Sequence, residues 1–161
     1  MSWHLAQVNI ARTKSSFSHP MMAELASRIA EMNALAEASP GFVWRFTSES
    51  HPDNRLELFA DYFVPFDRDC FFFNMSVWES VEALQHYAFK TAHLELYRNR
   101  QAWMDSFPHA HAALWWILKG TTPTVAEAKR RLLELEQTGP TASAFTFTNQ
   151  FPRPANAGAN N

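Results

Sequence analysis

Apolar and polar side chains alternate along several short stretches of the chain, as they do in strands that have one buried face. The clearest case is residues 3–12, which read WHLAQVNIAR. In an extended chain, Ala6, Val8 and Ile10 share one face, and Asn9 lies on the opposite face. The pattern predicts a first strand with one core-facing side and one more polar side.

A second alternating stretch covers residues 71–79, FFFNMSVWE. Its apolar side chains at every second position suit a core-facing surface. The opposite face would carry Asn74, Ser76 and Trp78. This polar side is either the wall of a chamber or a seam between two subunits, and in one fold the same residues can serve as both.

The other elements follow from spacing and from helix and turn signals. Apolar spacing of three and four residues predicts helices, with Pro40 ending the first and a Thr124–Glu127 capping box opening the last. The stretch 56–66 suits a short strand or a hairpin arm. The predicted elements are strands at 41–47, 112–120 and 144–148, and helices at 19–39, 80–107 and 124–138.

This order predicts an α+β fold of the ferredoxin-like βαββαβ type, with an antiparallel sheet, two helices on one face and an extra C-terminal helix. Residues 1–149 would form a single domain, and residues 150–161 a disordered tail. The second face of the sheet carries bulky aromatic side chains and needs cover. A homodimer packed sheet against sheet would supply that cover.

Composition narrows the function classes. With 47% hydrophobic and 19% charged residues among 161, the chain suits a folded domain with its own core. A net charge of -2 predicts neither nucleic acid nor a membrane surface as a partner. Cys70 is the only cysteine, so an internal disulfide is impossible. The sequence contains no long apolar span or signal-like leader, so we expect a cytoplasmic protein.

The predicted helix 80–107 carries the most informative face. Its intervals of three and four residues align Phe89, His93, Leu96, Arg100, Trp103 and Phe107. In a pocket, a neutral His93 imidazole would serve as a general base or an iron ligand. Arg100 would hold an anionic group by a bidentate contact. Alternatively, the stripe faces the core, where His93 is hydrogen-bonded and Arg100 is ion-paired.

Indole and amide side chains supply the rest of the candidate site. Trp44 and Trp103 would form flat apolar walls for a planar or aromatic ligand. Asn9 and Asn74 could hydrogen-bond dioxygen or a developing oxyanion, with Ser76 beside them. Each has a structural alternative, in which Trp44 is core and the polar groups bond across a subunit interface.

Several segments together resemble a known bacterial family. They are HLAQVNIAR, NALAEASPGFVWRF, NMSVWESVEAL, the H-x6-R-x2-W pattern from His93 to Trp103, LWW at 114–116, and GPTASAFTF. The chain resembles the family called domain of unknown function 3291, of the dimeric α/β-barrel superfamily. This resemblance implies a ferredoxin-like homodimer.

The superfamily includes heme-degrading monooxygenases, cofactor-free oxygenases, cyclases and regulatory ligand-binding domains. Its heme-degrading members use an Asn on the first strand, a Trp on the third and a His on the second helix. Asn9, Trp78 and His93 occupy those elements here. The resemblance therefore implies that heme could bind with His93 as ligand, and equally that the site could work without a cofactor.

These observations predict a monooxygenase-like oxidoreductase that acts on heme or another planar aromatic molecule between sheet and helices. The predicted catalytic residues are His93, Asn9, Trp78 and Arg100, and the predicted substrate-binding residues are Trp103, Asn74, Ser76 and Trp44. No metal site is predicted apart from His93 if heme is bound. The alternatives are a cofactor-free isomerase or cyclase with His93 as base, and a non-catalytic ligand-binding module.

Overall fold

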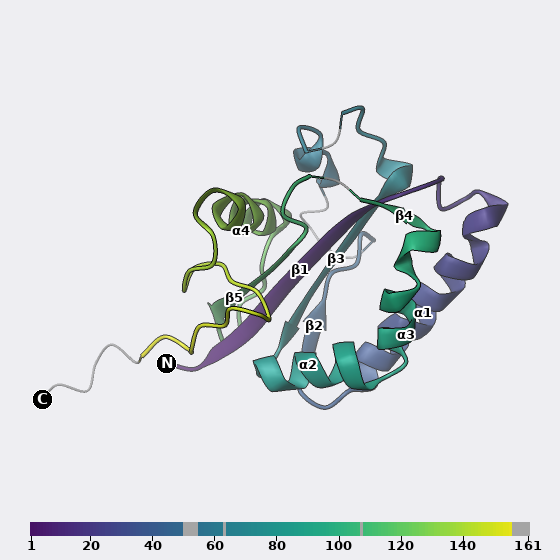
Figure 1. The fold of residues 1–161 in the computed structure, drawn as a ribbon. Helices are drawn as coiled ribbons and strands as arrows, with labels where there is room; N and C mark the ends of the chain where they lie inside the picture. The colour runs from purple at the N-terminus through teal and green to yellow at the C-terminus, as the bar shows by residue number, and fades with distance from the viewer. Residues whose placement is uncertain (50–54, 63, 107, 156–161) are drawn as a thin grey trace, which may run out of the picture.

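One antiparallel sheet organises the molecule (Figure 1). The computed structural model describes residues 1–49, 55–62, 64–106 and 108–155. Its strands are β1 (Trp3–Thr13), β2 (Phe42–Arg45), β3 (Phe71–Trp78), β4 (Met104–Asp105) and β5 (Ala112–Leu118). Strand β1 pairs with β3 on one side and with both β4 and β5 on the other, while β2 flanks β3. The predicted α+β, ferredoxin-like fold is confirmed.

The register between β1 and β3 fixes which side chains share a face. Asn9 lies opposite Asn74, and Gln7 lies opposite Ser76. The alternate β1 residues Ala6 and Val8 are buried on the other face. The alternation seen in the sequence therefore separates a polar face from a core face in the two central strands.

Three helices cover the polar face of the sheet: α1 (Ala23–Ala38), α2 (Val81–Lys90) and α3 (His93–Arg98) (Figure 1). Ala36 of α1 and Leu84 of α2 join Leu5 and Trp78 in one hydrophobic cluster on this side. Helix α2 begins at Ser80, whose hydroxyl accepts a hydrogen bond from the Ala83 amide at 3.1 Å. The cluster lies at one end of the sheet and leaves the middle of the polar face to other contacts.

Helix α4 (Val125–Thr138) covers the opposite face, together with the 3-10 turn η2 (Leu56–Phe59). Leu132 of α4 and Phe59 of η2 are fully buried there with Trp115 of β5. The bare, aromatic face that suggested a sheet-against-sheet dimer is thus covered by the chain itself. That reason for expecting a dimer does not hold.

The predicted helix 80–107 is not continuous. Helix α2 ends at Lys90, and Thr91 adopts an extended conformation before α3 begins at His93. The Thr91 hydroxyl donates to the Tyr87 carbonyl and accepts from the His93 amide, so it ends one helix and helps to start the next. A 3-10 turn, η4 (Arg100–Ala102), and strand β4 follow, so the predicted stripe does not lie on one helix face.

Two smaller predictions also change. Residues 56–59 form the turn η2 rather than a strand or hairpin arm. Near the C-terminus, Phe145 makes an isolated bridge to Leu114, in place of the predicted edge strand at 144–148. Each segment contributes a buried aromatic ring to the core rather than a full hydrogen-bonded ladder.

The C-terminal segment is ordered further than its composition suggested. The Trp116 indole Nε1 donates to the Phe151 carbonyl at 3.0 Å, and Arg153 donates to the Glu79 carbonyl at 2.8 Å. The Arg153 guanidinium also lies 5.3 Å from the Trp116 ring centroid. Residues 150–153, assigned to a disordered tail from sequence, therefore pack against the sheet, and residues 156–161 lie outside the described part of the chain.

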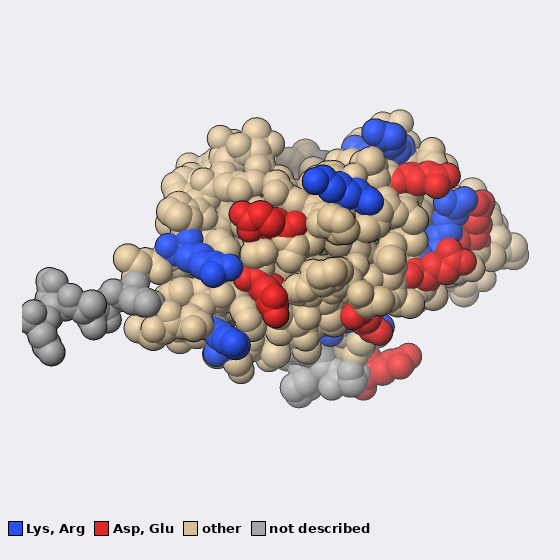
Figure 2. Space-filling view, turned by 90° about the horizontal axis from the view of Figure 1, so that it is seen from below, with Lys and Arg blue, Asp and Glu red and all other residues tan. Residues whose placement is uncertain are grey.

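The surface shows no separation of charge on the face in Figure 2, where acidic and basic side chains are interspersed. None of the helices in the described ranges is both long enough and apolar enough to cross a membrane.

Gly41 forms the tight junction between α1, β2 and α2. Its φ of 82° favours glycine, and a Cβ built there would lie 2.5 Å from the Ala83 Cβ. We expect Gly41→Ala to lower the free energy of unfolding by about 2 to 4 kcal/mol. Gly120 has a φ of 90° with nothing within 4 Å of such a Cβ, so Gly120→Ala should cost only about 1 kcal/mol. If urea denaturation gave the same loss of unfolding free energy for Gly41→Ala and Gly120→Ala, the close packing of Gly41 against Ala83 would be contradicted.

Candidate functional site

Four side chains on the polar face form one hydrogen-bonded chain, which we call the polar ladder: Gln7, Asn74, Ser76 and Trp78. Gln7 Nε2 donates to Asn74 Oδ1 at 2.6 Å and to Ser76 Oγ at 2.7 Å. Trp78 Nε1 donates to the same Ser76 Oγ at 2.8 Å. Because both Gln7 donor protons are used, the Asn74 amide is held with its oxygen toward Gln7 and its NH2 group available to a ligand.

Asn9 adds a second amide beside the ladder. It lies directly across the β1–β3 pair from Asn74 and is half-buried. Across the described residues, its side chain makes no hydrogen bond. Asn9, Asn74 and Gln7 stay partly exposed although they sit on the two central strands, so the helices do not close tightly over them. Two amides thus remain partly exposed at the middle of the sheet.

An aromatic stack connects the ladder to His93. The Tyr87 ring stacks on Trp78 with centroids 5.2 Å apart and an interplanar angle of 23°. The His93 ring lies 4.9 Å from the Tyr87 ring. The Tyr87 hydroxyl donates to the Met32 carbonyl of α1 at 3.1 Å, which fixes the ring between helices. Burial raises the pKa of Tyr87 to about 12, so this phenol stays neutral.

His93 has the protonation state that a base requires. Burial lowers its pKa below the ordinary value of 6.5, despite a hydrogen bond to the Ala88 carbonyl that opposes the shift. The ring is therefore neutral at pH 7. Its Nδ1 lies 3.1 Å from the Ala88 carbonyl oxygen, which can only accept, so Nδ1 carries the proton. Nε2 keeps its lone pair for a proton or a metal.

The structure does not bring three of the predicted residues to this site. Arg100 is exposed on η4, where it donates to the Tyr97 carbonyl at 2.9 Å and stacks on the Tyr97 ring. Trp44 packs on the core face, opposite the ladder. Trp103 lies beyond η4, where its carbonyl accepts from the Lys14 amide at 2.8 Å. Phe107, also in the predicted stripe, is outside the described residues.

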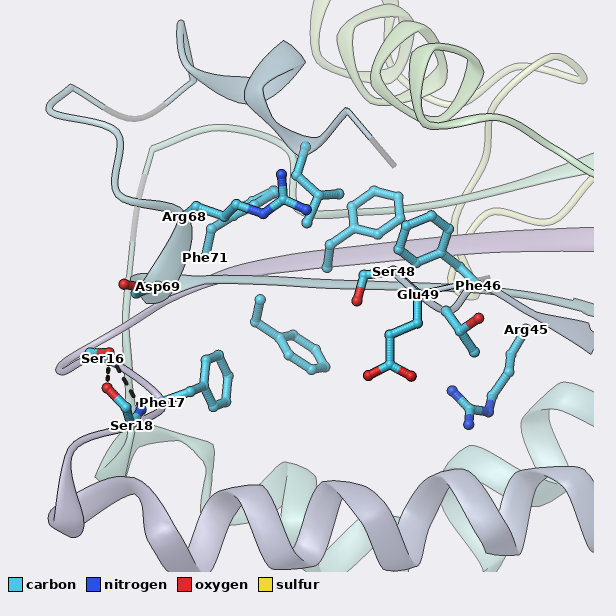
Figure 3. Close-up of a pocket in the computed structure, with 14 residues that line it drawn as sticks. Ser16, Phe17, Ser18, Arg45, Phe46, Ser48, Glu49, Arg68, Asp69 and Phe71 are labelled. Atoms are coloured by element: carbon cyan, nitrogen blue, oxygen red, sulfur yellow. Dashed lines mark hydrogen bonds between the residues drawn. The ribbon is translucent and has the colours of Figure 1, made fainter. Parts of the chain in front are cut away.

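An open cleft of about 630 Å³ lies between the start of β3 and α1 (Figure 3). Its lining includes Phe72, which shares the polar face of β3 with Asn74, and Arg45, which lies opposite Ser76 in the register. Arg45 is ion-paired with Glu37 of α1 at 2.6 Å. The cleft therefore begins where the polar ladder ends.

Two residues that were not predicted from sequence, Gln7 and Tyr87, join the predicted ones. Gln7 lies on the same face as Asn9 at the next alternate position, so the pattern that selected Asn9 could also have selected Gln7. Tyr87 lies six residues before His93 and touches it only because the helix breaks at Thr91. No sequence signal pointed to Tyr87.

A heme would need an axial ligand, a cavity beside it and a partner for its anionic groups. The neutral His93, with Nδ1 held by a carbonyl, has the chemistry of an axial ligand. The remaining requirements are not met: His93 does not line the cleft, and Arg100, which was expected to hold an anionic group, stacks on the exposed Tyr97 ring instead. The described side chains therefore do not fit heme. No group of three or more His, Cys, Asp or Glu side chains in the described ranges could hold a metal ion.

Fold and site together define a ferredoxin-like α+β protein with a polar, partly exposed sheet face beneath its helices. The chain belongs to the family described as domain of unknown function DUF3291, whose model matches residues 4–160. This confirms the family that the sequence segments indicated. A search among curated proteins finds no match.

Solved structures of similar fold are distant in sequence. SnoaB from Streptomyces nogalater, a cofactor-independent oxygenase, is 18% identical, with 74% of this chain and 95% of that chain covered and a TM-score of 0.46. NE2512 from Nitrosomonas europaea, of unknown function, is 16% identical, with 76% and 96% covered and a TM-score of 0.49. PA3566 from Pseudomonas aeruginosa is 16% identical, with 75% and 98% covered and a TM-score of 0.46.

The lowered pKa of His93 predicts how stability depends on pH. The unfolded chain binds a proton at His93 near the ordinary pKa of 6.5, whereas the folded protein binds it only at lower pH. Stability is therefore full above that pKa and falls as the pH drops below it. Between about pH 7.5 and about pH 5.5, the free energy of unfolding should therefore fall less for His93→Gln than for wild type, as measured by urea denaturation.

His86 provides the matched control for this comparison, since it is an exposed histidine of the neighbouring helix α2. His86→Gln should follow the wild-type curve. A His93→Gln curve parallel to that of wild type would mean that His93 is not buried in its neutral form.

Proposed function

We propose that this protein is an oxidoreductase that oxidises a planar aromatic small molecule with dioxygen, without a metal or organic cofactor. The observation that carries the proposal is a neutral, half-buried histidine that contacts Tyr87, whose ring stacks on Trp78 at the end of the polar ladder. His93 supplies a base, and Asn9 and Asn74 supply hydrogen-bond donors. A reaction that begins with proton removal needs both.

The chemistry follows from these roles. Dioxygen reacts without a cofactor only with substrates that form electron-rich anions, such as polycyclic phenols with an acidic ring CH2 group. His93 Nε2 would remove that carbon-bound proton, and the Asn9 and Asn74 amides would stabilise the resulting enolate oxygen. The anion transfers an electron to dioxygen, and the two radicals join as a peroxide anion, which takes back the proton from His93 to become a hydroperoxide. Loss of water from the hydroperoxide leaves a ketone, so one CH2 and one O2 yield one C=O and one H2O.

The aromatic stack would position the substrate. Trp78 is fully buried beneath Tyr87 and holds that ring in place, so a planar ring would pack against the partly exposed Tyr87. Ser76 is buried and already accepts two hydrogen bonds, so it holds Trp78 and Gln7 rather than the ligand. We therefore assign Ser76 and Gln7 as positioning residues.

The same base and amides would also serve a cofactor-free isomerase or cyclase, because enolate formation begins both reactions. The oxygen requirement separates the two: an isomerase would turn over in the absence of dioxygen, and an oxygenase would not.

We also propose how the protein assembles and where it is located. A homodimer remains our expectation for this family, although it must use a surface other than the sheet face that α4 covers. Light scattering of the purified protein would give its mass in solution. We propose a cytoplasmic protein, since neither composition nor charge points to another compartment.

The proposal predicts His93-dependent oxygen uptake. With an anthrone as probe, metal-depleted wild-type protein should consume dioxygen and form the quinone faster than buffer. His93→Ala should lower kcat/KM about 100-fold or more, and Asn74→Ala about 10- to 100-fold. His86→Ala is the histidine control and should leave the rate unchanged. Equal rates for His93→Ala and wild type would contradict the proposal.

A further inference from the structure

The cleft beside β3 has a wall of phenylalanine rings. Phe17 and Phe72 lie with centroids 6.4 Å apart, and Phe46 and Phe73 meet edge to face at 5.0 Å. All four line the cleft, and Phe17 points into it from the segment before α1 (Figure 3). With a volume of about 630 Å³, the cleft is large enough for a small ring-containing ligand.

The charges around the cleft are unbalanced. Both arginines in its lining form ion pairs with glutamates that do not line it. Arg45 pairs with Glu37 at 2.6 Å, and Arg68 pairs with Glu57. The Glu49 carboxylate also lines the cleft and extends into the space above α1 (Figure 3). Within the described ranges, Glu49 makes no ion pair or hydrogen bond.

Asp69 adds a second carboxylate to the lining and makes no ion pair with any described residue. Two guanidinium groups therefore face four carboxylates in and next to the cleft. The excess charge is negative and lies beside aromatic faces, whose quadrupoles also attract positive charge.

We propose that this cleft binds an organic cation: a small molecule with an aromatic body and a protonated amine. The Phe17 and Phe72 rings would pack against the aromatic body, and Glu49 would hold the ammonium group. This inference goes beyond the proposed oxidation, because it assigns a charge to the ligand and residues that take no part in the chemistry on the ladder. Binding can be measured without turnover, so either proposal can fail alone.

The test uses three probes that share a 2-(1-naphthyl)ethyl group and carry a cationic, neutral or anionic group at its end. They are 2-(1-naphthyl)ethylammonium, the neutral 2-(1-naphthyl)ethanol and the anionic 3-(1-naphthyl)propanoate. Isothermal titration of the full chain should show the cation binding about tenfold more tightly than the alcohol, and the anion most weakly. Added salt should weaken only the binding of the cation, which tests the charge contribution on wild-type protein without any substitution.

Two variants locate the site. Glu49→Gln should remove the tenfold preference for the cation and leave the affinity for the alcohol unchanged. Glu82→Gln changes an exposed glutamate of α2 that does not line the cleft and should bind all three probes as wild type does. Equal affinity for the three probes, tightest binding of the anion, or a cation preference that survives Glu49→Gln would overturn the proposal.

Discussion

The hydrogen bonds of the Gln7 amide across β1 and β3 are the interaction on which the rest of the site depends. Gln7 bridges two side chains of the neighbouring strand, Asn74 and Ser76, at 2.6 and 2.7 Å. Ser76 in turn accepts the Trp78 indole proton, so one amide fixes the positions of three side chains. The buried Ser76 hydroxyl and Trp78 indole would be costly without partners, and these hydrogen bonds allow both groups on the inner face of the sheet.

The packing of the helices follows from this row. Trp78, held by Ser76, offers its ring face to Tyr87, and Tyr87 contacts His93 of the next helix. The helix layer is thereby anchored over one end of the sheet, while the amides in the middle remain partly exposed. On the other face, α4 and η2 close the core within the chain. One face is thus completed by packing, and the amides of the other stay partly exposed beneath the helices.

The strands and their faces could be predicted from sequence because apolar and polar side chains alternate every two residues, a pattern that is visible within a single strand. Asn9 and Asn74 were placed on the polar side by that pattern alone, and their pairing agrees with it.

The helix after β3 could not be predicted in the same way. Apolar spacing continues through Thr91, but the Thr91 hydroxyl competes for backbone groups and ends the helix, and this places Arg100 on the surface. Likewise, no local signal shows that α4 covers the second face of the sheet, since that depends on a tertiary contact. The cleft also escaped prediction, because the residues that line it come from four separate segments.

The most direct test of the account is whether His93 removes a substrate proton before dioxygen takes part. An anthrone mixed with wild-type protein in the absence of dioxygen should form its anion in a stopped-flow absorbance trace, and the anion should decay when dioxygen is admitted. His93→Ala should form no anion above the buffer level, whereas His86→Ala should behave as wild type. Anion formation that is unaffected by His93→Ala, or product formation without any anion, would contradict the central role assigned to this histidine.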